Sequence, residues 1–231
     1  MTRSGAAART VRAVLLDMLG TLVELRDPVP RLRAELRDRT GVDVGDEAAA
    51  RGFGAEIAYY LDHHMEGRDR ESLEDLRDHC AAVMHDALRV DRLARADVRA
   101  AMLASLEFTP FPDVEAALAA LRQLGLRVVI ASNWDWSLPQ WVEATGLDRL
   151  VDGTASSAVV GAPKPAPDVF REALRVAGVG ADEAIHVGDS LEGDVHGARA
   201  AGLRAVLLQR DGEAPGDVES IRSLAELPSL L

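Results

Sequence analysis

Residues 15–22 read LLDMLGTL and place a polar turn directly after an apolar run. The run begins at residue 11, and its sequence VRAVLL has the length and composition of a buried β-strand. Asp17 ends the run, and Gly20 and Thr21 supply a turn. Parallel sheets carry their active sites at the carboxyl ends of their strands. Asp17 is therefore a candidate catalytic residue.

The second half of the chain alternates strands with helices. Apolar runs predict strands at 127–132, 184–188 and 204–208. Amphipathic stretches predict three helices between and beside them; we expect Asp113 to cap the first, and Gly125, Gly178 and Gly202 to end the three. This alternation predicts an α/β fold, in which a parallel sheet is covered by helices on both faces.

Residues 28–106 have helical periodicity without a strand signal. We expect helices from Pro30 to just before Gly41, over 46–65, around 72–88 and over 97–106. In the third helix, the predicted apolar stripe consists of Leu73, Leu76, Cys80, Val83 and Ala87. The block reads as an all-helical insert. We therefore predict a core formed by residues 1–22 and 107–231 and a helical cap formed by residues 23–106.

Composition limits the possible partners of the 231-residue chain. Its net charge of -12, without a basic stripe, argues against nucleic acid and disfavours an acidic membrane surface. The apolar run near the start is too short for a signal peptide or a membrane span. The single cysteine, Cys80, cannot form an internal disulfide, so we expect a cytoplasmic protein.

The chain has 25 arginines and a single lysine, Lys164. Because an ammonium and a guanidinium are not equivalent, this lysine marks a place where only the compact group fits. Chance survival of one lysine is the alternative. Lys164 lies in the stretch GAPKPAP, at 161–167, where prolines stiffen the loop.

Polar residues follow the predicted strands, and a parallel sheet would bring them to one edge. Asp17 follows the first strand, Ser132 and Asn133 stand at the end of the strand at 127–132, and Asp189 follows the strand at 184–188. Asp194 lies about one helical turn beyond Asp189. An aspartate after a strand is usually a turn or helix-cap residue, so no single one of them is decisive. Their order along the chain is more informative than any single residue.

Taken together, LLDMLGTL, IASN at 130–133, the GAPKPAP lysine and GDSLEGD at 188–194 resemble the haloacid dehalogenase superfamily of hydrolases. The resemblance covers residues 11–22 and 108–210, and the helical insert falls where subgroup I of that family carries its cap. The resemblance implies a Rossmann-like parallel sheet with an inserted all-helical cap domain.

The resemblance also implies roles for individual residues. Asp17 would be the nucleophile that forms a covalent aspartyl intermediate, and Lys164 would neutralise charge beside it. Ser132 and Asn133 would bind substrate or phosphate oxygens. Mg²⁺ would be bound by Asp17, Asp189 and the backbone carbonyl of Leu19. Asp194 would be a partner of Lys164 or of a water on the metal.

Leu19 departs from the family pattern. Phosphatases of the family have an aspartate there, which protonates the leaving oxygen, and 2-haloacid dehalogenases usually have an aromatic residue. Phosphonoacetaldehyde hydrolases have a small residue and use a cap lysine, but this cap contains none. The acidic GDSLEGD stretch disfavours the dehalogenase route, which uses no metal.

Two readings of the cap remain open. His63 or His64 could replace the missing acid, and Tyr59, Tyr60 and Arg68 could help to shape a substrate pocket. Alternatively, these residues form a solvated helix end. Asp135, just after Asn133, is another candidate proton donor.

These observations favour a Mg²⁺-dependent phosphatase that acts on a small phosphorylated metabolite through an aspartyl-phosphate. The first alternative is a catalytically impaired binding protein that kept the cleft and lost the acid. The second is a 2-haloacid dehalogenase-type hydrolase. The sequence leaves open whether the protein is a monomer or a homodimer.

Overall fold

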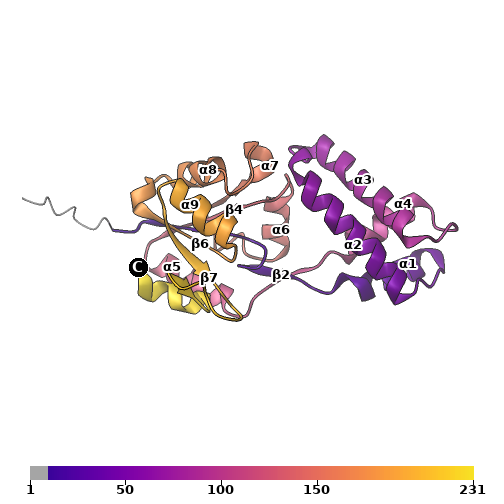
Figure 1. The fold of residues 1–231 in the computed structure, drawn as a ribbon, viewed down its shortest axis with the longest axis horizontal. Helices are drawn as coiled ribbons and strands as arrows, with labels where there is room; N and C mark the ends of the chain where they lie inside the picture. The colour runs from indigo at the N-terminus through magenta and orange to yellow at the C-terminus, as the bar shows by residue number, and fades with distance from the viewer. Residues whose placement is uncertain (1–9) are drawn as a thin grey trace, which may run out of the picture.

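Six parallel strands form the sheet around which most of the chain is organised (Figure 1). The structure is a computed structural model, and it describes residues 10–231. The strands lie in the order β5-β4-β1-β6-β7-β8. Their bounds are Ala13–Leu16 for β1, Arg127–Ser132 for β4, Gly153–Ser156 for β5, Ala184–Gly188 for β6, Arg204–Leu208 for β7 and Ser220–Ile221 for β8. The prediction of a Rossmann-like α/β fold is confirmed.

Helices cover both faces of the sheet because its central strand is apolar on both sides. In β1, Val14 and Leu16 face one hydrophobic cluster, and Ala13 and Leu15 face another. The first cluster is completed by α5 (Val114–Gln123), α6 (Leu138–Ala144) and the 3₁₀ helix η4 (Leu224–Leu230). The second is completed by α8 (Asp168–Ala177), the π-helix η3 (Leu191–His196) and α9 (Gly197–Ala200). The short helices α7 (Ser157–Val160) and η2 (Ala181–Glu183) precede α8 and β6.

A separate group of helices, which we call the helical unit (residues 28–105), lies beside the sheet-containing part (Figure 1). It consists of α1 (Pro28–Thr40), α2 (Asp46–His63), the 3₁₀ turn η1 (His64–Glu66), α3 (Arg70–Leu88) and α4 (Arg95–Ser105). These helices pack around a hydrophobic cluster of their own. Within residues 10–231, no helix is both long and apolar enough to cross a membrane. The division of the chain at residues 22/23 and 106/107 stays a prediction.

The two connections to the helical unit pair with each other. β2 (Val23–Leu25) and β3 (Phe108–Pro110) form an antiparallel ribbon. Sequence patterning gave no sign of it, because each strand has three residues, too few to show a period. Strands β5 and β8 were missed for a similar reason, since β5 reads GTAS and β8 has two residues.

Two details of the expected helices are wrong, and a third is right only in part. The first helix begins at Pro28 rather than Pro30, because the side chain of Asp27 accepts a hydrogen bond from the Val29 N–H and caps it. Asp113 is the N-cap residue of α5, as expected, but its side chain makes no capping hydrogen bond; its Oδ2 accepts hydrogen bonds from Arg210 and Ser223 instead. In α3, the buried stripe is rotated: Val83 and Ala87 are half-buried, and the buried residues are Leu73, Leu76, Cys80, Ala81, Met84 and Leu88.

Candidate active site

The carboxyl ends of β1, β4 and β6 lie side by side because these three strands are neighbours in the sheet. The Asp17 N–H donates to the Val187 carbonyl at 3.0 Å, which fixes the start of the turn against β6. The turn needs glycine at position 20: its φ is +83°, and a Cβ there would collide with the carboxyl of Asp189. The turn and Asp189 therefore approach each other closely.

Asp17 is buried, and one of its oxygens is held by two donors. Oδ1 accepts a hydrogen bond from Ser132 Oγ at 2.8 Å and from Lys164 Nζ at 2.5 Å. Oδ2 accepts no hydrogen bond from any described residue. Burial raises the pKa of Asp17, and the charge of Lys164 opposes that rise. The arrangement fixes the carboxyl and leaves one oxygen available.

Lys164 lies between two carboxyls. Its Nζ is 2.5 Å from Asp17 Oδ1 and 2.6 Å from Asp194 Oδ1, and its side chain is almost completely buried. Burial acts to lower the pKa of Lys164, but the charges of Asp17 and Asp194 outweigh burial and raise it. The lysine is therefore held as an ammonium. Asp194 makes the contact with Lys164 that was one of the two roles expected for it.

Asp194 is the most fully satisfied of these carboxyls. Besides Lys164, it accepts hydrogen bonds from His186 Nε2 at 2.9 Å and from the Ser190 N–H at 3.0 Å. Burial would raise the pKa of Asp194, but Lys164 and His186 hold it below its ordinary value. His186 lies inside β6, and nothing in the sequence indicated its contact with Asp194.

Asn133 contacts the lysine loop. Its Oδ1 accepts from the Lys164 N–H at 2.6 Å, and its Nδ2 donates to the Lys164 carbonyl at 3.1 Å. This pair of bonds fixes the backbone of the residue whose ammonium reaches Asp17. The structure therefore gives Asn133 a positioning contact, while its predicted binding of substrate oxygens stays a prediction.

Three carboxyls at these strand ends suit a cation. Asp17, Asp189 and Asp194 each offer an oxygen, and the three oxygens lie within 4.8 Å of one another. Burial, followed by the charges of Asp17 and Asp194, raises the pKa of Asp189 to about 6. A hard divalent cation with oxygen ligands, such as Mg²⁺, would relieve this repulsion. Because Asp194 is already satisfied, Asp17 and Asp189 are the carboxyls that fit such a site.

The backbone carbonyl of Leu19 is also free. The turn uses the carbonyls of Met18 and Val23 as acceptors, and no described N–H donates to that of Leu19. Leu19 is 44% exposed, and it lines a cavity of about 230 Å³ between the sheet-containing part and the helical unit. It is an apolar wall of that cavity.

Of the cap candidates, Tyr60 lines this cavity, whereas Tyr59, His63, His64 and Arg68 do not. His63 stacks on Tyr59, and its Nδ1 bonds the Tyr59 carbonyl at 2.8 Å. His64 Nδ1 bonds the Leu61 carbonyl at 3.0 Å, and Arg68 is exposed. Glu56, another residue of α2, also lines the cavity and was not among the candidates.

Asp135 does line the cavity and is buried. Its Oδ2 accepts a hydrogen bond from Tyr60 Oη of α2 at 3.0 Å, and its Oδ1 accepts from the Ser137 N–H at 2.7 Å. Nearby, the Trp136 N–H donates to the Gly67 carbonyl at 2.7 Å. These contacts join the helical unit to the loop after β4.

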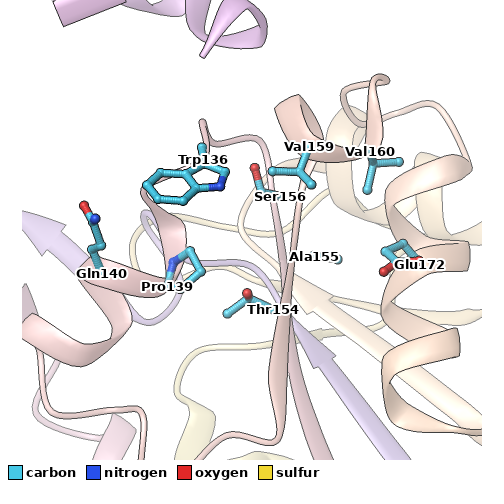
Figure 2. Close-up of a pocket in the computed structure, with 9 residues that line it drawn as sticks. All are labelled: Trp136, Pro139, Gln140, Thr154, Ala155, Ser156, Val159, Val160 and Glu172. Carbon is cyan, nitrogen blue, oxygen red and sulfur yellow. The ribbon is translucent and has the colours of Figure 1, made fainter. Parts of the chain in front are cut away.

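A larger hollow of about 540 Å³ lies elsewhere, beside the edge strand β5 (Figure 2). Figure 2 shows Trp136 and Pro139 on one side of it and Glu172 of α8 on the other, with Thr154 of the edge strand β5 between them. None of the predicted catalytic or metal-binding residues lines it. The volume of a hollow is therefore no guide here to the site of the clustered carboxyls.

Known proteins resemble this chain in sequence and in fold. Residues 11–202 match the model of the haloacid dehalogenase-like hydrolase family. The chain is 30% identical to haloacid dehalogenase-like hydrolase domain-containing protein 3 of Bos taurus, over 95% of this chain and 91% of that protein. It is 31% identical to a plasmid phosphoglycolate phosphatase of Cupriavidus necator, over 95% and 92%. The crystal structure of a defluorinating L-2-haloacid dehalogenase superposes with a TM-score of 0.74 at 21% identity, covering 100% of this chain and 98% of that one. At that identity the dehalogenase shares the fold alone.

Proposed function

The chain belongs to the haloacid dehalogenase-like hydrolase family, and we propose that it is a Mg²⁺-dependent phosphatase that acts through an aspartyl-phosphate. The observation that carries the proposal is the cluster at the strand ends. Asp17 has one oxygen held by Ser132 and Lys164 and one oxygen free, with the carboxyl of Asp189 beside it. The similarity to a phosphoglycolate phosphatase over most of both chains supports phosphate as the group transferred.

In the first step, Asp17 Oδ2 attacks the phosphorus of a phosphate monoester. A bond forms between Oδ2 and phosphorus, and the bond from phosphorus to the organic oxygen breaks, so that the organic group leaves as an oxyanion that takes a proton from water. In the second step, water attacks the phosphorus of the aspartyl-phosphate. Inorganic phosphate leaves, and the carboxylate of Asp17 is restored.

Lys164 supports both steps with a fixed positive charge. Its ammonium is held by Asp17 and Asp194, so it does not reorganise as negative charge grows on the phosphoryl oxygens. Ser132 and Asn133 keep this geometry, Ser132 by its bond to Asp17 and Asn133 by its two bonds to the lysine backbone. The network therefore holds the Asp17 nucleophile in a fixed position before substrate binds.

Mg²⁺ would be bound by Asp17, Asp189 and the free backbone carbonyl of Leu19. When bound, it neutralises charge on the transferring phosphoryl group. The carbonyl does not depend on the side chain at position 19, so leucine there is compatible with the metal site. What leucine removes is a proton donor.

The proposal is tested by phosphate release from a panel of phosphorylated metabolites, with Mg²⁺ and with a chelator. We expect hydrolysis that stops when the metal is removed and returns when it is added back. Haloacids in the same assay separate the alternatives: halide release that needs no metal would replace the proposal with a dehalogenase. Binding of phosphorylated ligands without turnover of any substrate would replace it with a binding protein.

A further inference from the structure

The cavity beside Leu19 is built from both parts of the molecule. Leu19, Trp134 and Asp135 come from the segments that follow β1 and β4, next to Asp17 and Ser132, and the opposite walls come from α2, α3 and α4. Most of the lining is apolar, including Leu25, Phe53, Ile57, Met102, Phe108 and Trp141. At about 230 Å³, the cavity has room for one compact organic group.

Glu56 stands out in this lining. It is 6% exposed and lies on α2 within the apolar part of the cavity wall. In the described chain its partner is the thiol of Cys80, which is a weak donor, and no cationic side chain contributes to its environment. Burial raises the pKa of Glu56 to about 7. A buried carboxyl with so little compensation is uncommon, because charged groups inside proteins are normally paired.

The other charged groups of the lining do not compensate it. Asp135 is a second buried carboxyl, already bonded to Tyr60 and Ser137. Arg77 is the cation of the lining, and its guanidinium binds Glu74 at 2.8 Å. The cavity therefore presents two carboxyls, with its one guanidinium paired to a residue outside the lining. Its electrostatic character favours a ligand with a positive end.

We propose that the organic part of the substrate is a compact apolar group that carries a primary amine, and that Glu56 binds this amine. The inference rests on the proposed phosphatase function, since it places the phosphate at Asp17 and Lys164 and the organic group in the cavity. An ammonium supplies the charge-assisted hydrogen bond that Glu56 lacks within the protein. The apolar walls exclude water from the remainder of the group.

A matched pair of substrates isolates this contact. In para-(aminomethyl)phenyl phosphate and para-ethylphenyl phosphate, an ammonium in one replaces a methyl in the other, while size and the phosphate ester are kept. For the protein as it stands, we expect kcat/KM to be about 10- to 100-fold higher for the amine, the size of a charge-assisted hydrogen bond. For Glu56→Gln, we expect the ratio to fall toward unity, with the loss on the amine substrate.

Glu47→Gln is the matched control, because Glu47 lies on the same helix, is exposed and does not line the cavity. It should keep the ratio of the unsubstituted protein. A ratio near unity before any substitution, or a high ratio that survives Glu56→Gln, would overturn the inference. Far-ultraviolet circular dichroism of Glu56→Gln checks that the isosteric variant is folded.

Calorimetric binding of the two phosphate-free phenols separates this inference from the proposed function. Preferential binding of para-(aminomethyl)phenol that is lost in Glu56→Gln would support the amine site even if neither ester were hydrolysed. Hydrolysis of both esters without a preference for the amine, in binding or turnover, would leave the phosphatase proposal standing and reject the amine site.

Discussion

Asp194 and Glu56 are both buried carboxyls, and their surroundings differ sharply. Asp194 accepts hydrogen bonds from Lys164, His186 and the Ser190 N–H. The hydrogen-bond partner of Glu56 is the Cys80 thiol. Accordingly, the pKa of Asp194 lies below its ordinary value, because Lys164 and His186 outweigh burial, whereas burial raises that of Glu56 to about 7. The first carboxyl is neutralised by the fold itself, and the second is left for a group that the fold does not supply.

The comparison separates two kinds of region. The network around Asp17 contains its own counter-charge, so it is preorganised before any substrate binds. The cavity around Glu56 contains apolar walls and an uncompensated carboxyl, so it is completed by what it binds. The first region suits chemistry common to many substrates, and the second suits discrimination among them. The following substitutions alter one region at a time.

The largest effect is expected for Asp17→Asn. The amide can keep the hydrogen bonds to Ser132 and Lys164 but cannot attack phosphorus, so turnover should fall by at least about 10⁴-fold. Phosphate release under saturating Mg²⁺ measures the loss. Asp38→Asn, an exposed aspartate of α1, is the control and should retain activity. Substantial residual turnover in Asp17→Asn would mean that another residue is the nucleophile.

Lys164 variants come next, and both Ala and Arg should be damaging. Removing the ammonium leaves Asp17 and Asp194 buried without their shared counter-charge, which costs about 3–5 kcal/mol of stability and about 10²- to 10³-fold in kcat. Arg restores the charge but not the compact shape, and the site is closed around Nζ at 2.5 and 2.6 Å. Chemical denaturation and kcat are the measurements. Near-normal activity of Lys164→Arg would favour chance survival of the single lysine.

Leu19→Asp changes a residue that belongs to the turn after Asp17 and also lines the cavity. A well-placed general acid contributes about 10²- to 10⁴-fold, and the present side chain cannot donate a proton. We expect Leu19→Asp to raise turnover of alkyl phosphates by about 10²-fold and aryl phosphates much less, because a phenoxide leaves readily without protonation. Leu19→Asn is the isosteric control without an acid. If the alkyl-to-aryl ratio is the same in all three proteins, a donor other than residue 19 already acts, and Asp135 is then the residue to replace.

The region around Asp17 could be predicted from sequence because its residues follow apolar strands. Those strands are long enough to recognise, and their parallel order brings the following residues to one edge. The distances to Lys164 could not be predicted, since they depend on the loop that Asn133 fixes. His186 illustrates the same limit: inside a strand it reads as packing, and its bond to Asp194 appears only in three dimensions.

The cavity could not be predicted. Its walls come from α2, α3, α4, α6, the β2–β3 ribbon and the segments after β1 and β4, and no spacing in the sequence relates them. The stretch around His63 and His64 drew attention because histidine is common in catalysis, yet neither residue lines the cavity. Glu56 drew none, because one glutamate in a helix is ordinarily solvated. Its burial depends on how α2 packs against α3 and on which face the helical unit turns toward Leu19.

The smallest effect is the most direct measure of the uncompensated carboxyl, the pH dependence of stability in Glu56→Gln. Burial raises the pKa of Glu56 from 4.5 to about 7 in the folded protein. Between these values the unfolded chain has lost the proton that the folded chain still holds. The stability of the unsubstituted protein should therefore fall as pH rises through this window and level off above about pH 7. The shift corresponds to at most about 3 kcal/mol, and we expect about 2 kcal/mol because a charged side chain can relax toward solvent.

Glu56→Gln has no proton to lose, so its advantage in chemical denaturation should grow from about pH 5 to about pH 8. Glu47→Gln, on the exposed side of the same helix, should show no such gain. Equal pH profiles for Glu56→Gln and the unsubstituted protein would show that Glu56 is already compensated in the free protein, and the contrast with Asp194 would then disappear.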